Sequence, residues 1–148
     1  MKRVILLICV IFSAIYASGQ SSSKKADKIS VITKLTNIDS AIVKTANLLL
    51  ENSILIDKVD YKIGYISTKP FQVGINSYQR NLLRFSIENG VVKISLYGEF
   101  RIITDDMFNT DFGWDKIEFP KIKGSVMYQA WNALAVLAMQ LESISSSK

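Results

Sequence analysis

Histidine is absent from this 148-residue chain, and cysteine occurs only once, at position 9. Without histidine the chain cannot form a serine–histidine catalytic pair, and it lacks the side chain that most often serves as a general acid or base. A single cysteine cannot close a disulfide within the chain, and it is too few for a zinc or haem site of cysteine and histidine ligands. These absences favour a binding protein without a cofactor over an enzyme.

The N-terminus has the three parts of a secretory signal peptide. Lys2 and Arg3 form a basic start, residues 4–12 are continuously apolar, and small residues occupy positions 17 and 19. Signal peptidase requires small residues three positions before and directly before the bond it cuts, so we predict cleavage after Gly19. Cleavage would also remove the only cysteine.

Two other interpretations of this segment are weaker. The apolar run is shorter than the about 20 residues that a membrane-spanning helix needs, which disfavours an uncleaved anchor. Lipid attachment at Cys9 would need a small residue before the cysteine, whereas Ile8 is bulky. We therefore expect no membrane anchor after cleavage.

Removal of residues 1–19 leaves 129 residues, the size of one ordinary domain. We predict a flexible polar leader at 20–28, a single domain at 29–144 and a polar tail at 145–148. The remaining 16 basic and 13 acidic residues give a net charge of +3, and the basic ones are scattered, so we expect no nucleic-acid partner. An exported domain without disulfides or asparagine-linked glycosylation sites is typical of a bacterium, and we expect a periplasmic or extracellular location.

The most specific structural pattern is an Asn89-Gly90 pair between two runs that alternate apolar and polar residues. Such a pair predicts a two-residue type I′ turn, because both of its central residues need positive φ. The turn would pair Glu88 with Val91 and fix the register of the whole hairpin. The expected apolar pairs are Ile87 with Val92, Phe85 with Ile94 and Leu83 with Leu96, and the expected polar pairs are Ser86 with Lys93 and Arg84 with Ser95.

The remaining patterns predict two helices and further strands. Residues 29–35 alternate as a strand, and a helix capped by Asn37 or Asp39 follows. Alternation at 61–66 predicts a strand that ends near position 69, and 117–119 predicts a short strand. A helix with nearly continuous apolar residues follows Ser125, which we predict as its cap. The order β-α-β-β-β-α predicts an α+β two-layer sandwich, an antiparallel β-sheet with two helices packed on one face.

An acidic loop at 105–115 is the first candidate site. Asp105, Asp106 and Asp111 supply oxygen ligands of the kind that calcium uses, but their spacing matches no EF-hand loop. A solvated loop explains them as well, so we expect no metal. The alternative function is a carboxylate-dependent hydrolase with this loop at its site, although no spacing singles out a catalytic pair.

A second candidate is the polar face of the hairpin, which could bind an anionic ligand or a partner or could be the wet side of the sheet. A third is the aromatic loop that includes Phe108, together with the back of the last helix, where Val136 and Met139 lie. Either the loop and the helix cover one another, or they form an exposed apolar patch. Such a patch would suit a homodimer through the last helix. The binding candidates on the hairpin and the loop are Arg84, Lys93, Tyr97, Arg101, Phe112 and Trp114.

The whole-domain pattern resembles small exported bacterial proteins of unknown function with a TATA-box-binding-protein-like α+β fold. The resemblance rests on the signal peptide, on residues 48–52 and 61–68, on the Asn89-Gly90 hairpin and on the last helix with Trp131. The resemblance concerns the shape of the fold alone. It implies no catalytic residues and no DNA binding. We therefore expect an exported non-enzymatic envelope domain that binds a protein, a peptide or a small ligand.

Overall fold

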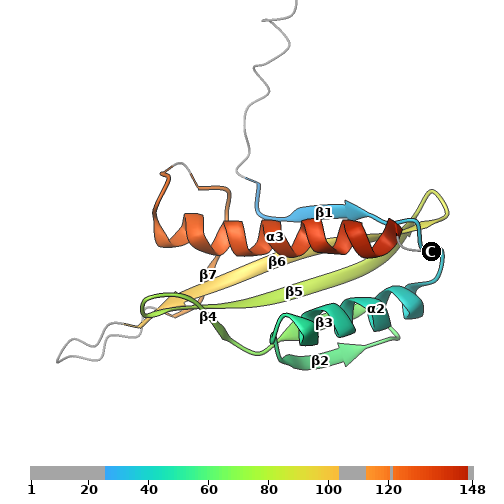
Figure 1. The fold of residues 1–148 in the computed structure, drawn as a ribbon, viewed down its shortest axis with the longest axis horizontal. Helices are drawn as coiled ribbons and strands as arrows, with labels where there is room; N and C mark the ends of the chain where they lie inside the picture. The colour runs from blue at the N-terminus through green and yellow to red at the C-terminus, as the bar shows by residue number, and fades with distance from the viewer. Residues whose placement is uncertain (1–25, 104–112, 121, 147–148) are drawn as a thin grey trace, which may run out of the picture.

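A seven-stranded antiparallel sheet and two helices make up residues 26–103, 113–120 and 122–146, which the computed structural model describes (Figure 1). The strands lie in the order β1-β6-β5-β3-β2, with β4 paired to β5 and β7 paired to β6. Both helices cover the same face of the sheet, so the chain is an α+β two-layer sandwich, as predicted. The elements are β1 (Ile29–Ile32), α2 (Ile38–Glu51), β2 (Ile56–Asp60), β3 (Tyr65–Thr68), β4 (Phe71–Gly74), β5 (Ser77–Glu88), β6 (Val91–Ile102), β7 (Asp115–Lys116) and α3 (Val126–Ser146).

The long hairpin of β5 and β6 forms the centre of the sheet. Asn89 and Gly90 have φ angles of 53° and 79°, so both turn residues adopt the positive φ that a type I′ turn requires. Glu88 pairs with Val91, and the register continues without a shift to Ser77 opposite Ile102. Every pair predicted from the alternation is confirmed.

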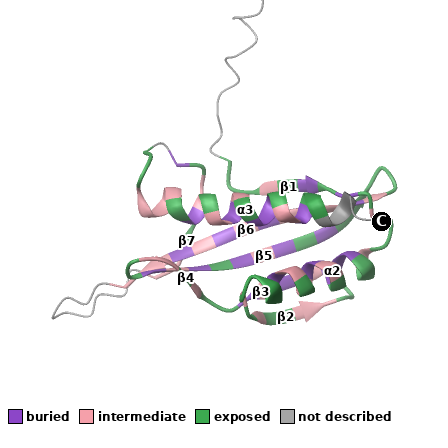
Figure 2. Ribbon diagram, in the orientation of Figure 1, coloured by how far each residue is buried: buried purple, intermediate pink, exposed green. Residues whose placement is uncertain are grey.

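The helices bury their apolar stripes against this hairpin (Figure 2). The Asn37 side chain accepts a hydrogen bond from the Ser40 backbone N–H at 3.0 Å and so caps α2, as the sequence predicts. Ser125 accepts one from the Tyr128 N–H at 3.1 Å and caps α3. Within the described ranges, neither helix is long and apolar enough to cross a membrane.

Burial on this side of the sheet supplies most of the stability. Each large apolar side chain removed from water contributes about 1.5–3 kcal/mol. The largest apolar side chains with almost no exposure are Ile42, Leu49, Ile66, Leu83, Ile94, Leu96, Ile117 and Leu134.

The predicted strand over 61–66 is wrong in its first half. Residues 61–64 form a turn, because Asp60 accepts hydrogen bonds from the N–H groups of Lys62 at 3.0 Å and Ile63 at 3.3 Å. Gly64 completes the turn with φ 63°. The turn joins β2, which the sequence analysis did not predict, to β3.

The two short strands near β5 and β6 also differ from expectation. β4 forms a second hairpin with β5, which was not predicted. β5 begins at Ser77, six residues before Leu83, the first residue of the predicted alternation. The predicted strand at 117–119 is displaced, since the paired residues are Asp115 and Lys116. Ile117 follows them, donates its N–H to the Gly98 carbonyl at 2.9 Å and is fully buried.

Candidate functional site

The face of the sheet that points away from α2 and α3 is uncovered by any described element (Figure 1). We call it the open face. Side chains alternate along each strand, so the neighbours of buried core residues point to this side. The open face contains Tyr65, Ser67, Tyr78, Arg80, Leu82, Arg84, Ser86, Lys93, Ser95, Tyr97, Glu99 and Arg101.

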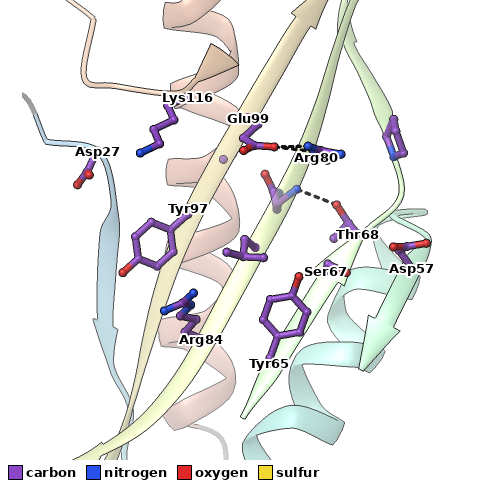
Figure 3. A pocket seen from close by; sticks show the side chains of 14 residues that line it. Asp27, Asp57, Tyr65, Ser67, Thr68, Arg80, Arg84, Tyr97, Glu99 and Lys116 are labelled. Atoms are coloured by element: carbon purple, nitrogen blue, oxygen red, sulfur yellow. Dashed lines mark hydrogen bonds and ion pairs between the residues drawn. The ribbon is translucent and has the colours of Figure 1, made fainter. Parts of the chain in front are cut away.

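A depression of about 800 Å³ lies on the open face (Figure 3). This volume falls within the range of about 300–1,000 Å³ that is typical of small-molecule sites. Its lining comes from β2, β3, β5, β6 and β7 and from the segments before β1 and after β3, so residues distant in sequence meet there. They are Asp27, Asp57, Tyr65, Ser67, Thr68, Pro70, Arg80, Asn81, Leu82, Arg84, Tyr97, Gly98, Glu99 and Lys116.

One end of the depression is held by an ion pair between neighbouring strands. An Arg80 guanidinium nitrogen lies 2.6 Å from a Glu99 carboxylate oxygen. The Arg80 guanidinium also lies 4.5 Å from the centre of the Trp114 ring, and the Arg101 guanidinium lies 5.6 Å from the same ring. Both members of the ion pair are more than a third exposed, so water screens their attraction and the pair contributes about 0–1 kcal/mol. Its effect is mainly to fix the position of Arg80.

The middle of the depression has an apolar floor between aromatic and hydroxyl groups. Leu82 on β5 pairs directly with Tyr97 on β6 and with Ser67 on β3. Two residues further along β5, Arg84 pairs with Tyr65 on β3, so Tyr65 and Tyr97 stand on either side of β5. Figure 3 shows Tyr65, Ser67, Arg84 and Tyr97 around the same hollow.

Arg84 differs from Arg80, the other arginine of the depression, in its surroundings. Its guanidinium lies 6.0 Å from the centre of the Tyr97 ring. Its cross-strand partners, Tyr65 and Ser95, are both neutral. Among the described residues, no carboxylate lies within ion-pair distance of Arg84.

The lining as a whole is electrically balanced. Its three acidic residues, Asp27, Asp57 and Glu99, match its three basic residues. Glu99 is engaged by Arg80, while Asp27 and Asp57 stand at opposite sides of the hollow (Figure 3). Long-range attraction of an ion is therefore weak, and recognition would depend on local contacts.

The structure brings several predicted residues together and separates others. Arg84 and Tyr97 line the depression. Arg101 does not line it, but its guanidinium contacts the same Trp114 ring as that of Arg80, which does. Lys93 is on the same face but near the hairpin turn, where it forms an ion pair of 2.6 Å with Glu88. The predicted site residues that lie outside the described ranges are Asp105, Asp106, Phe108, Asp111 and Phe112.

Trp114 does not cover the back of the last helix. Its ring contacts Arg80 and Arg101, which lie on the face opposite α3. Phe119 contacts the helix instead, with its ring centre 5.5 Å from that of Trp131 in a perpendicular arrangement. Val136 and Met139 on the outer side of α3 are 48% and 60% exposed. The homodimer through this helix stays a prediction.

Of the fourteen residues that line the depression, only Arg84 and Tyr97 were predicted from the sequence as binding residues. Arg80, Leu82 and Glu99 continue the alternation of the hairpin and could have been found by extending its register. Tyr65 and Ser67 depend on the pairing of β3 with β5, for which no local signal exists. Within the described ranges, no cluster of three or more acidic, histidine or cysteine residues could hold a metal ion.

Comparisons with known proteins add no assignment. A scan against protein-family models gives no match for this chain, and a search of the curated proteins gives none either. Function is therefore inferred from the chemistry of the open face.

Proposed function

We propose that this chain is an exported binding domain of the bacterial envelope whose open face holds a small ligand or a short segment of a partner. The observation that carries this proposal is the depression of about 800 Å³ on a sheet face that no described element covers. An antiparallel sheet needs only one covered face to be stable, so the other face is available for binding.

Preorganised side chains distinguish this face from an ordinary solvated one. Arg80 is held between Glu99 and Trp114, and Arg84 lies over the ring of Tyr97. Long flexible side chains that are already fixed lose less conformational entropy when a ligand binds. The two tyrosines offer large rigid surfaces together with hydroxyl groups, which suits recognition of a mixed polar and apolar ligand.

Binding is favoured over catalysis on chemical grounds. The chain has no histidine, and the proposed cleavage removes its only cysteine. The alternative, a hydrolase that uses Asp105, Asp106 and Asp111, depends on residues outside the described ranges. No observation on the described residues favours it. The resemblance to small exported proteins with a TATA-box-binding-protein-like fold remains part of the same proposal.

Export is tested by producing the full chain in a bacterium and weighing the protein from the periplasm by mass spectrometry. We expect a chain that begins at Gln20. Replacing the small residue before the bond, in Gly19→Arg, should leave the precursor uncut. Retention of residues 1–19 in the unsubstituted protein, or a lipid on Cys9, would contradict the export proposal.

Binding is tested by an NMR screen of small polar and aromatic compounds against the chain that begins at Gln20. We expect the compounds that bind to shift the backbone signals of Ser67, Leu82 and Tyr97. Leu82→Glu should abolish these shifts, because it places a charge on the apolar floor. Ser86→Glu is the matched control, since it adds the same charge to the same face of β5 outside the depression. Shifts confined to α2 and α3 would refute the proposal.

A further inference from the structure

We infer that the depression recognises an oxyanion, a carboxylate or a phosphate, carried on a flat apolar group, with Arg84 as the residue that binds the anion. The inference rests on the proposed function, because it assigns a ligand class to the same depression. It follows from three features of the open face: the distribution of its ion pairs, the groups around Arg84 and the apolar floor.

The first feature is the distribution of ion pairs on the open face. Arg80 is paired with Glu99 at 2.6 Å, and Lys93 is paired with Glu88 at 2.6 Å. Arg84 lies between these pairs along β5 and β6, yet it has no carboxylate within ion-pair distance among the described residues. A guanidinium keeps its charge at all physiological pH values. Of the two guanidinium groups of the depression, Arg84 is thus the one whose planar donors remain available to an anion.

The second feature is the set of groups that surround this guanidinium. The centre of the Tyr97 ring lies 6.0 Å from it, at the outer limit of a cation–π contact. Tyr65 is its cross-strand neighbour on β3, and Ser67 is the next residue of that strand to point to the same side. Tyrosine and serine hydroxyls donate hydrogen bonds to oxyanions. Arginine, tyrosine and serine together offer the donors that a carboxylate or a phosphate accepts.

The third feature is the apolar floor beside the anion-binding group. Leu82 is two residues from Arg84 along β5, on the same face, and lies between Ser67 and Tyr97. A bare inorganic anion would leave Leu82 and the tyrosine rings in contact with water. A ligand with a flat apolar group next to its anionic group would cover them and gain the hydrophobic contribution of that area. The ligand class is therefore an aromatic or similarly flat oxyanion.

The experiment compares four probes by NMR titration of the chain that begins at Gln20. Benzoate and phenyl phosphate combine both features, inorganic phosphate lacks the ring, and benzyl alcohol lacks the charge. We expect benzoate, phenyl phosphate or both to bind at Ser67, Leu82 and Tyr97 about tenfold or more tightly than the other two probes. Benzoate alone would indicate a carboxylate ligand, and phenyl phosphate alone a phosphate ester.

Arg84→Gln should weaken the anionic aromatic probes about tenfold and leave the affinity for benzyl alcohol unchanged. Lys93→Gln is the matched control, because it removes a charge of the same face that Glu88 already neutralises, and it should change neither affinity. Both positions are on the water-facing side, so folding should persist, and unchanged spectra outside the open face would verify it.

Equal binding of neutral and anionic probes, or an undiminished preference for anions in Arg84→Gln, would overturn the inference. The proposed function would survive that result, because the probes would still bind to the open face. Binding of all four probes to the helices alone would instead refute the proposed function itself.

Discussion

Gly98 lies directly against the side chain of Ile117. We therefore expect Gly98→Ala to destabilise the natural protein but to stabilise a variant in which Ile117 is shortened to alanine. A Cβ atom added to Gly98 would stand 2.5 Å from Cδ1 and 3.3 Å from Cγ1 of Ile117. Ile117 is fully buried, so it has little room to move. Overpacking of this kind costs about 1–3 kcal/mol. We therefore expect Gly98→Ala to lower the free energy of unfolding by that amount.

Ile117→Ala removes both carbon atoms that a new Cβ would meet. On its own it should cost about 2–5 kcal/mol, through lost burial and the cavity that remains. In that background Gly98→Ala meets no obstacle from position 117, and alanine loses less conformational freedom on folding than glycine, by about 0.5–1 kcal/mol. The second substitution should therefore stabilise the shortened protein.

The reversal gives a coupling energy of about 1.5–4 kcal/mol between the two positions, the difference between the two effects of Gly98→Ala. Urea unfolding of the four proteins, followed by circular dichroism, measures it, provided that the dependence on urea concentration is the same in all four. Contributions that add to within about 0.5 kcal/mol would refute the reasoning, since they would mean that Ile117 does not fill the space above Gly98.

Three further predictions concern the cap of α2, the turn of the central hairpin and the ion pair of Arg80. Asn37→Ala should lower the free energy of unfolding by about 1 kcal/mol, because the Ser40 N–H loses its partner; urea unfolding measures it, and an unchanged midpoint would contradict the cap. Gly90→Ala should cost about 1–2 kcal/mol, because φ is 79° there; the same assay applies, and a loss below a few tenths would argue against the type I′ turn. Arg80→Gln should change stability by less than about 1 kcal/mol yet raise the mobility of the Trp114 ring, read as lower fluorescence anisotropy in a Trp131→Phe background; unchanged anisotropy would show that Arg80 does not hold the ring.

The central hairpin could be predicted from sequence because its information is local. A two-residue turn with positive φ at Asn89 and Gly90 leaves a single register, and the apolar residues on both sides agree with it. The helix caps at Asn37 and Ser125 are equally local, since each side chain binds an N–H three residues away. These elements also place Arg84 and Tyr97 on one face, which is why both were identified as binding candidates.

The start of β5 could not be predicted, because its buried side is polar. Ser77, Gln79 and Asn81 are almost fully buried where the alternation rule expects apolar residues. The Gln79 side chain donates to the Asn81 side chain at 2.7 Å, and the Asn81 N–H donates to the Thr68 hydroxyl at 2.9 Å. The Asn81 bond to Thr68 forms only once β3 and β5 lie together, and among the described residues Ser77 Oγ and Gln79 Oε1 are buried without a hydrogen-bond partner, so no local pattern announces this strand.

The β3 side of the depression follows from the core rather than from any motif of its own. Tyr61 and Ile63 alternate with Tyr65 in sequence, yet they are 53% and 71% exposed, because the turn after Asp60 interrupts the strand. Ile66 is fully buried under the helices, and this burial fixes the register of β3. A slip of one residue would expose Ile66 and turn both Tyr65 and Ser67 toward the helices. The same contact that stabilises the fold therefore directs these two hydroxyl groups to the face where Arg84 lies.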